Sequence, residues 1–187
     1  LVGIPYTGNT SYQSNVSWWN SGFLTNRIRS FAFKFYNNLL GLNTRTAHFI
    51  PNPNRNCTFC IIRDGTAVDE TFLHLFHDCP TTIAWHNEFL RRNFNNLVLD
   101  RNNSLKFWFL GILPNETDPN LAILSAILIF QFHCWEEKLR KRGPSFLTLS
   151  NLFEETFRLT VKLSTDIRAM CPSLPFSLFR TVAALGP

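Results

Sequence analysis

The chain has 187 residues and is 45% apolar, which allows one domain with a hydrophobic core and excludes an intrinsically disordered polypeptide. Its net charge is +5, and no acidic side chain precedes Asp64. Such a one-sign segment beside a folded core indicates contact with a polyanion, although a solvated positive face that binds nothing specific would have the same composition. Nineteen Phe against three Tyr indicates Phe-rich helices that pack on one another.

The sequence shows no targeting or membrane signal. Residues 1–10 lack the basic start, apolar run and cleavage site of a secretory signal. The most apolar stretch, Leu121–Trp135, ends in charged residues and is too short to span a bilayer. We therefore expect an intracellular protein of the cytoplasm and nucleus, without a membrane partner. Because the chain does not begin with Met, we expect it to be a piece of a longer protein.

The N-terminal third is predicted to be an arm followed by a basic helix and loop. Residues 1–22 are rich in Asn, Ser, Thr and Gly, which is typical of a linker or extended arm. Residues 23–56 form the basic segment. Its helix is predicted over 23–41, with Thr25 as the cap and Gly41 at the stop, and a basic loop or short helix follows.

Residues 57–94 are expected to hold a Cys/His cluster and a helix that begins at Pro80, a residue suited to the first helical turn. Residues 95–187 are expected to be a C-terminal helical region. After a mixed stretch at 95–117, Asp118 and Pro119 predict the start of a long helix.

That long helix is predicted to run to about Arg142, where Gly143 and Pro144 stop it, and a further helix is predicted from about 146 to 170. No stretch shows the period-two alternation of a strand followed by a hairpin turn. The expected fold class is therefore mostly α: a helical domain with an inserted CCHC zinc knuckle and no substantial sheet.

The residues that carry chemistry are Cys57, Cys60, His74 and Cys79. Their spacing, Cys-x2-Cys followed by His-x4-Cys, supplies three thiolates and one imidazole, the four ligands of a closed structural zinc site. A redox pair is the alternative for the first two cysteines, but the helix-start setting of such pairs is missing. His77 is the rival fourth ligand, with a cramped spacing to Cys79. If it is not a ligand, we expect it to be exposed or to support one.

The remaining cysteines and histidines are not expected to bind metal. Cys134 and Cys171 lie in apolar helical surroundings and are typical of small core residues. His48 is expected at the surface and His133 in the core.

The cluster lies within a recognisable motif. The run Asp-Glu-Thr-Phe-Leu-His-Leu-Phe-His-Asp-Cys-Pro at 69–80, with Cys-Thr-Phe-Cys at 57–60 before it and Trp85 after it, resembles the zinc-binding region of non-LTR (LINE-type) retrotransposon reverse transcriptases. The resemblance covers about residues 27–165 and is sharp over 57–85. The thirteen-residue spacer between the two ligand pairs is longer than is usual in that family.

The resemblance implies that this is the C-terminal part of a polyprotein, beyond the polymerase body, which would be a partner. It also implies binding of element RNA and target DNA during target-primed reverse transcription. The chain has no Tyr-x-Asp-Asp sequence and no adjacent aspartates, so we do not expect it to polymerise. A nuclease would need converging carboxylates, and the one Glu-x-Lys, at 136–138, is expected to be a solvated helix terminus.

The function expected is nucleic-acid binding, to RNA, DNA or both. If a base stacks on the knuckle, Phe59 is the candidate, although burial is the more ordinary role for it. The alternative is a zinc-stapled helical module that binds protein through the apolar helix at 119–135. The side chains expected to contact phosphates are basic and come from two parts of the chain: Arg27, Arg29, Lys34, Arg45, Arg55 and Arg63, and then Lys138, Arg140, Lys141 and Arg142. The second group would equally serve to complement the helix dipole.

Overall fold

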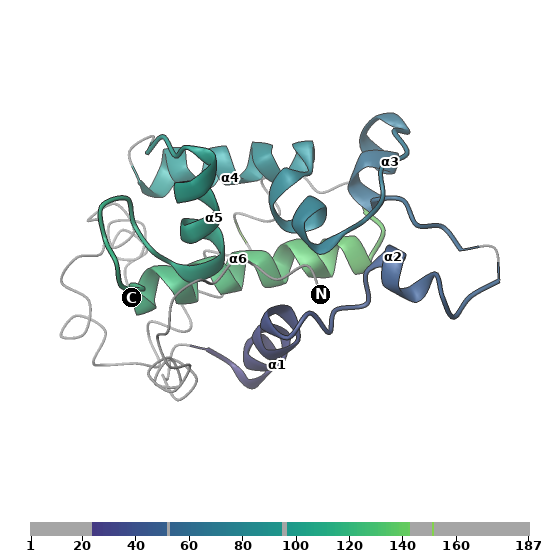
Figure 1. Ribbon diagram of the computed structural model, residues 1–187, viewed down its shortest axis with the longest axis horizontal. Helices are drawn as coiled ribbons and strands as arrows, with labels where there is room; N and C mark the ends of the chain where they lie inside the picture. The colour runs from purple at the N-terminus through teal and green to yellow at the C-terminus, as the bar shows by residue number, and fades with distance from the viewer. Residues whose placement is uncertain (1–23, 52, 95–96, 143–150, 152–187) are drawn as a thin grey trace.

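The computed structural model describes residues 24–51, 53–94, 97–142 and 151. The predicted arm at 1–22 lies outside them, as does nearly all of the helix predicted from about 146 to 170. Within the described ranges the chain is helical, which confirms the predicted class (Figure 1). In chain order the helical elements are α1 (Asn26–Tyr36), α2 (Asn43–Thr46), α3 (Thr58–Asp64), the π-helical turn η2 (His74–Asp78), α4 (Pro80–Asn93), α5 (Arg101–Leu110) and α6 (Leu121–Leu139).

The β-structure of these ranges is one isolated antiparallel bridge between Asn56 and Asp69. It pairs the chain just before α3 with the chain just before η2. The N–H of Glu70 donates to the carbonyl of Arg55 at 2.8 Å, and the N–H of Cys57 donates to the carbonyl of Val68 at 2.7 Å. The bridge therefore closes the base of the long loop between the two predicted ligand pairs.

Helix α1 begins as predicted but is shorter. The Thr25 hydroxyl accepts a hydrogen bond from the Ile28 N–H at 3.4 Å, which caps the helix. The predicted stop at Gly41 is wrong, because the helix ends at Tyr36 and Asn38 adopts a left-handed φ of 52°. Asn tolerates that conformation better than most residues, so it ends the helix before the glycine is reached.

The aromatic side chains pack between the helices. Phe35 of α1 has its ring centroid 4.9 Å from that of Phe76 in η2 and 5.8 Å from that of Phe109 in α5. Phe31, one turn earlier on α1, lies 5.5 Å from Phe132 of α6. Each such pair stabilises the fold by about 0.5–1.5 kcal/mol beyond the burial of its area. The prediction of Phe-rich helices that pack on one another is thus confirmed.

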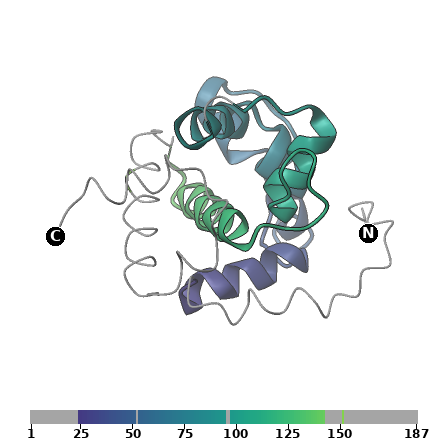
Figure 2. The same cartoon turned by 90° about the vertical axis from the view of Figure 1, so that its left-hand side faces the viewer.

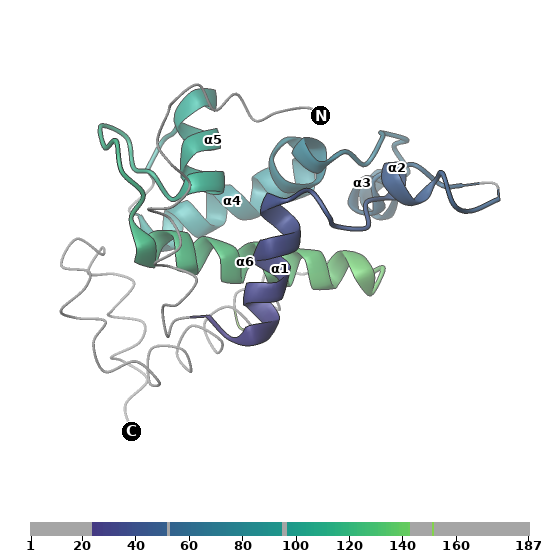
Figure 3. The same cartoon turned by 60° about the horizontal axis from the view of Figure 1, so that its bottom comes forward.

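Helix α6 runs through the middle of the described domain. Figure 2 looks along it, with α1 on one side and α4 and α5 on the other, and Figure 3 shows α1 crossing it. All residues from Ile123 to Cys134 are buried, as expected of a helix that is apolar all round. Among the described helices, α6 included, none combines the length and the apolar character needed to cross a membrane.

The ends of α6 differ from the prediction. Its start at Asp118 and Pro119 is wrong, because the helix begins at Leu121. The Asn120 side chain accepts the Ile123 N–H at 3.2 Å and so takes the capping role. The helix also stops short of Arg142, at Leu139, since the chain turns through a left-handed residue two positions later.

Helix α5 lies in the stretch for which no helix was predicted. Asp100 caps it by accepting the Asn103 N–H at 2.8 Å, and Gly111 ends it with a φ of 67°. A Cβ at Gly111 would lie 2.7 Å from the Cβ of Leu124 and 3.0 Å from its backbone. Glycine is therefore needed twice, for the left-handed turn and for the close approach of α5 to α6.

We predict that Gly111→Ala destabilises the domain by about 3 kcal/mol or more, because left-handed strain adds to overpacking against Leu124. Gly65 is the matched control: its φ is 74°, but a Cβ there would meet no atom within 4 Å. Gly65→Ala should cost only the strain, about 1–2 kcal/mol. Urea unfolding of the two variants measures the difference, and equal losses would show that the contact with α6 is unimportant.

Candidate metal centre

Cys57 and Cys60 are positioned by the start of α3. Cys57 is the residue before the helix and Cys60 lies in its first turn. The Cys57 N–H donates to the Val68 carbonyl at 2.7 Å, and the Cys57 carbonyl accepts the Ile61 N–H at 3.1 Å. The first pair of thiols is therefore held by a helix on one side and by the bridge on the other.

His74 and Cys79 are positioned by η2. The Cys79 N–H donates to the His74 carbonyl at 2.6 Å, which closes a π-helical turn, a form that is rare and often found at functional sites. The Thr71 hydroxyl accepts the His74 N–H at 3.1 Å at the start of the turn. Pro80 then begins α4, as predicted, with Cys79 as the residue before the helix.

The four side chains converge on one point. The Cys79 Sγ lies 3.9 Å from the Cys57 Sγ and 3.7 Å from the Cys60 Sγ, and the Cys60 Sγ lies 3.4 Å from the His74 Nε2. All four ligand atoms are within 4.8 Å of one another. Ligands placed tetrahedrally around zinc, with Zn–S bonds of about 2.3 Å, are about 3.8 Å apart. The cluster thus has the dimensions of a tetrahedral metal site.

The thiols are free rather than paired in disulfides. Their sulfur separations are far longer than the roughly 2.0 Å of an S–S bond. The two cysteines Cys57 and Cys60 do lie at a helix start, so the expectation that this setting is missing is wrong. A redox pair is disfavoured for another reason: Cys60 is as close to Cys79 and His74 as a shared metal requires. The cluster can hold a metal ion such as zinc, and its four donors fill the four positions of a structural site.

The electrostatics of the cluster favour a bound cation. A hydrogen bond from Cys57 and the amides of Thr81 and Thr82 at the start of α4 lower the pKa of Cys79 to about 5. The pKa of Cys57 is raised, chiefly by its hydrogen bond to Cys79 and by burial, and burial raises the pKa of Cys60. One thiolate is readily formed, and a cation is needed to stabilise three together.

His77 lies outside the cluster. It is buried, at 8% exposed, which excludes exposure to solvent, the first of the two alternatives expected for it if it is not a ligand. Its Nδ1 lies 2.7 Å from Asp78 Oδ1 and its Nε2 lies 3.0 Å from the Ser104 hydroxyl of α5. Asp78 in turn accepts a hydrogen bond from Arg101 at 3.0 Å, and these two neighbours lower its pKa although burial acts in the opposite direction. His77 therefore joins η2 to α5.

Glu70, which sequence reasoning did not single out, is fully buried beside the cluster. Its Oε1 accepts the Asn43 N–H at 2.8 Å and lies 3.0 Å from the Lys138 Nζ. Its Oε2 accepts the N–H and the hydroxyl of Thr58 at 3.1 and 3.2 Å. One carboxylate thus receives the first amides of α2 and α3, where helix dipoles favour an anion, and an ammonium from α6.

This carboxylate connects the metal centre to the rest of the domain. Thr58 directly follows Cys57. By binding both Thr58 and Lys138, Glu70 therefore links the segment that carries the first thiol to the end of α6. The Lys138 Nζ also donates to the Gly41 carbonyl at 3.1 Å and lies 4.7 Å from the ring centroid of Trp135. The signal for Glu70 was its place in the motif, but its partner Lys138 is too far along the sequence for any local pattern to indicate the pairing.

The last turn of α6 is not the solvated terminus that was expected for 136–138. Glu136, Glu137 and Lys138 are all buried, at 9, 3 and 5% exposed. Glu136 pairs with Arg27, and Glu137 pairs with Arg140 at 2.8 Å. Buried charges need partners, and here the pairs tie α1 and the chain after α6 to the core.

The predicted phosphate contacts fall into two groups. Six of the ten have their charge engaged within the domain, by acidic side chains or, for Arg29, by the Asn26 amide at 3.3 Å. Exposed pairs such as Arg55 with Asp69 at 2.9 Å and Arg63 with Asp64 at 2.6 Å are weak and leave the arginines reachable. Lys138 is not reachable, because it is buried. Of the ten, those that are exposed and form no ion pair with a described residue are Lys34, Arg45, Lys141 and Arg142; Lys106 on α5, which was not predicted, shares these properties.

Other expectations for single residues are met. Phe59 is buried, with its ring centroid 5.1 Å from that of Trp85 on α4, so it is not available for stacking on a base. Cys134 and His133 are buried on α6, and His48 is exposed. Cys171 lies outside the described residues.

Comparison with known protein families, curated proteins and solved structures finds no match for this chain.

We predict that His74→Ala abolishes metal binding whereas His77→Ala retains one zinc per chain. The reason is that His74 supplies a ligand atom to the cluster and His77 only bridges Asp78 and Ser104. Native mass spectrometry of both variants, purified with zinc, counts the bound metal. One zinc per chain in the His74→Ala protein would show that the wrong histidine has been assigned.

We predict that Glu70→Gln lowers the free energy of unfolding by about 3–5 kcal/mol, because it leaves the Lys138 ammonium buried without its counter-ion. Lys138→Met in the same background should recover part of the loss. Glu116→Gln is the control, since Glu116 is exposed. Urea unfolding checks this, and a loss as small as that of the control would refute the role given to Glu70.

Proposed function

We propose that this chain is the zinc-stabilised, nucleic-acid-binding C-terminal domain of a non-LTR retrotransposon reverse transcriptase. In that role it positions element RNA, target DNA or both for target-primed reverse transcription. The polymerase body of the same polyprotein is its neighbour, and the RNA-directed DNA polymerase chemistry belongs to that body. The domain itself binds and positions without catalysing a reaction.

The observation that carries the proposal is that the motif residues work together as one structural unit. Glu70 anchors the loop, and Thr71 starts the turn that presents His74. Cys79 is both a cluster member and the residue before α4. Trp85 packs on Phe59 of the Cys-x2-Cys turn. A chance match of sequence letters would not place each residue in a distinct role around one site.

Zinc suits the donor set, because three thiolates and one imidazole in a tetrahedron are typical of its structural sites. Cys57 and Cys60 would hold it from α3, and His74 and Cys79 from η2. The bound ion would supply folding free energy and no reaction chemistry.

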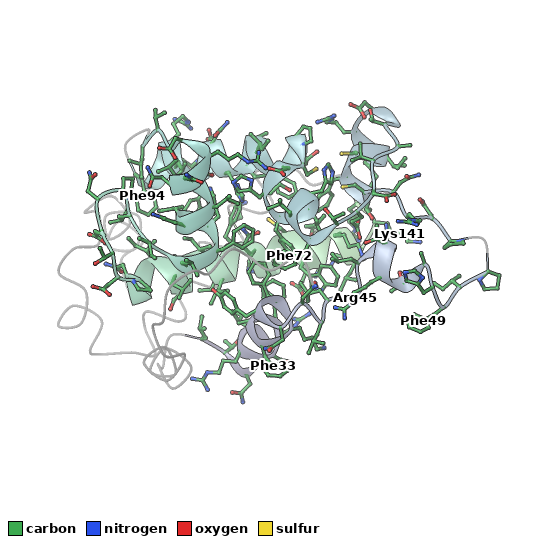
Figure 4. The ribbon with its side chains drawn as sticks, viewed as in Figure 1. Phe33, Arg45, Phe49, Phe72, Phe94 and Lys141 are labelled. Atoms are coloured by element: carbon green, nitrogen blue, oxygen red, sulfur yellow. The ribbon has the colours of Figure 1, made fainter. Side chains whose placement is uncertain are left out.

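The charge distribution supports nucleic acid as the ligand. The Lys138 bond to the Gly41 carbonyl sets the end of α6 beside the chain that enters α2. Figure 4 accordingly places Arg45 and Lys141 at the same end of the molecule. Two basic segments that are far apart in the sequence therefore contribute cations to one end of the molecule, which suits phosphate binding. We call this end, defined by Arg45, Lys141 and the adjoining Arg142, the basic end.

The second candidate remains a protein-binding module, and one observation favours it. Three apolar side chains near the cluster are partly exposed: Ile61 at 37%, Leu73 at 36% and Ile83 at 42%. Ile61 follows Cys60, Leu73 precedes His74, and Ile83 lies one helical turn after Cys79. Apolar side chains around a metal centre can dock a partner. The apolar helix at 119–135, on which this reading first rested, has its residues 123–134 buried and is not free to dock.

We predict that binding of the wild-type chain to RNA and DNA weakens steeply with salt, and that Arg45→Gln/Lys141→Gln makes it less salt-dependent. Removing two phosphate contacts should reduce the slope of log K against log salt by about 1.4 on a single strand. Fluorescence anisotropy at several salt concentrations measures this slope.

Arg91→Gln/Arg92→Gln is the matched control, because it removes the same charge from α4, where both arginines pair with Glu88. It should leave the slope nearly unchanged. Equal effects of the two double variants would argue against a defined basic end. A wild-type chain without salt-dependent binding would refute the proposal and favour the protein-binding module.

A further inference from the structure

The loop between α2 and α3 exposes an aromatic side chain in a domain that buries most of its others. Phe49 is 87% exposed, and Ile50 beside it is 56% exposed. Among the phenylalanines of the described ranges, Phe33 is the one other exposed residue, at 50%. A ring left in water forgoes the stabilisation that burial would give, and it is free to contact a ligand.

The base of this loop is held in place. The Phe49 N–H donates to the Thr46 carbonyl at 2.9 Å, which continues the turn after α2. At the other end the Asn56 N–H donates to the side-chain oxygen of Asn54 at 2.9 Å, and the Asn56 carbonyl accepts a hydrogen bond from the side-chain NH2 of Asn43 at 2.7 Å. The exposed ring is therefore presented by a loop anchored to α2 at both ends.

The surroundings of the ring are basic. Arg45, one helical turn before Phe49, is exposed, and so is His48. The chain between α2 and α3 contains no Asp or Glu. Asp69, which lies beside Asn56 at the end of this loop, has its carboxylate paired with Arg55. Figure 4 shows Phe49 at the same end of the molecule as Arg45 and Lys141. The ring thus extends the basic end.

The geometry points to a base-stacking site: we infer that Phe49 stacks on an unpaired base while Arg45 and Lys141 contact the adjoining phosphates. This inference rests on the proposed function and names its ligand as single-stranded nucleic acid. Aromatic side chains beside cations bind single strands in this way, because every base has a face for stacking. Within a duplex those faces are covered by neighbouring base pairs, so the ring has nothing to stack on.

The test compares the full chain with three Phe49 variants by fluorescence anisotropy. The probes are a labelled single-stranded RNA of about 16 nucleotides and mixed sequence, a DNA of the same sequence, and the matching duplexes. We expect Phe49→Ala to bind the single strands about tenfold more weakly and the duplexes within about twofold of wild type. Phe49→Tyr should retain binding, and Phe49→Leu should not restore it, since leucine is apolar without an aromatic face.

Phe33→Ala is the control, because it removes an exposed ring from α1, away from the basic end, and should leave the affinity unchanged. The salt slope should not change in Phe49→Ala, in contrast to Arg45→Gln/Lys141→Gln, because the ring contacts no phosphate. Cross-linking of an RNA that carries 5-iodouridine should join the probe to the segment around Phe49.

The outcomes separate this inference from the proposed function. Equal single-strand affinity of wild type and Phe49→Ala overturns the stacking site and leaves salt-dependent binding intact. Wild-type affinity in Phe49→Leu overturns it as well, because an apolar contact would then suffice. Absence of any nucleic-acid binding by the wild-type chain overturns both. If Phe49→Ala fails to fold, the comparison of Phe49→Tyr with Phe49→Leu decides the question.

Discussion

The arrangement of the domain depends on the hydrogen bonds and the ion pair made by the buried carboxylate of Glu70. A charge with no exposure to water is stable only where donors surround it, and here the donors come from three helices. The amide of Asn43 belongs to α2, that of Thr58 to α3 and the ammonium of Lys138 to α6. Because the carboxylate needs all of them at once, the three helix ends must meet at one place.

That meeting place orders the metal centre. Thr58 lies next to Cys57, and the bridge at Asn56 and Asp69 closes the same loop. On the opposite side, the turn from His74 to Cys79 packs its Phe76 against α1 and its His77 against α5. The cluster is thus held by contacts within the domain as well as by its own short loops. A bound ion would add to an existing scaffold.

The same pairing separates structural cations from available ones. Lys138 is buried by its contact with Glu70, and Arg27 is drawn to Glu136 on α6. Arg45 and Lys141 remain exposed, and the contact of Lys138 with the Gly41 carbonyl brings their segments to one end of the molecule. In the proposed function, one buried ion pair therefore shapes a surface to which it does not itself belong.

What the sequence determined by itself was local. The spacing of Cys57, Cys60, His74 and Cys79 identified the cluster, since the ligands within each pair are only a few residues apart and converge locally. Pro80 marked the start of α4 because its fixed φ suits a first helical turn. The mostly α class followed from periodicity, and the packing of Phe-rich helices on one another followed from the composition of nineteen Phe against three Tyr.

The tertiary structure decided whatever depends on residues distant in the sequence. The burial of Lys138 follows from Glu70, and the need for glycine at Gly111 follows from the approach of α6. It also decided which phenylalanine is accessible, since Phe59 is covered by Trp85 whereas Phe49 is left in water. A sequence pattern reports which neighbours a residue has within a helical turn, but burial and ion pairing are set by what the fold brings against it.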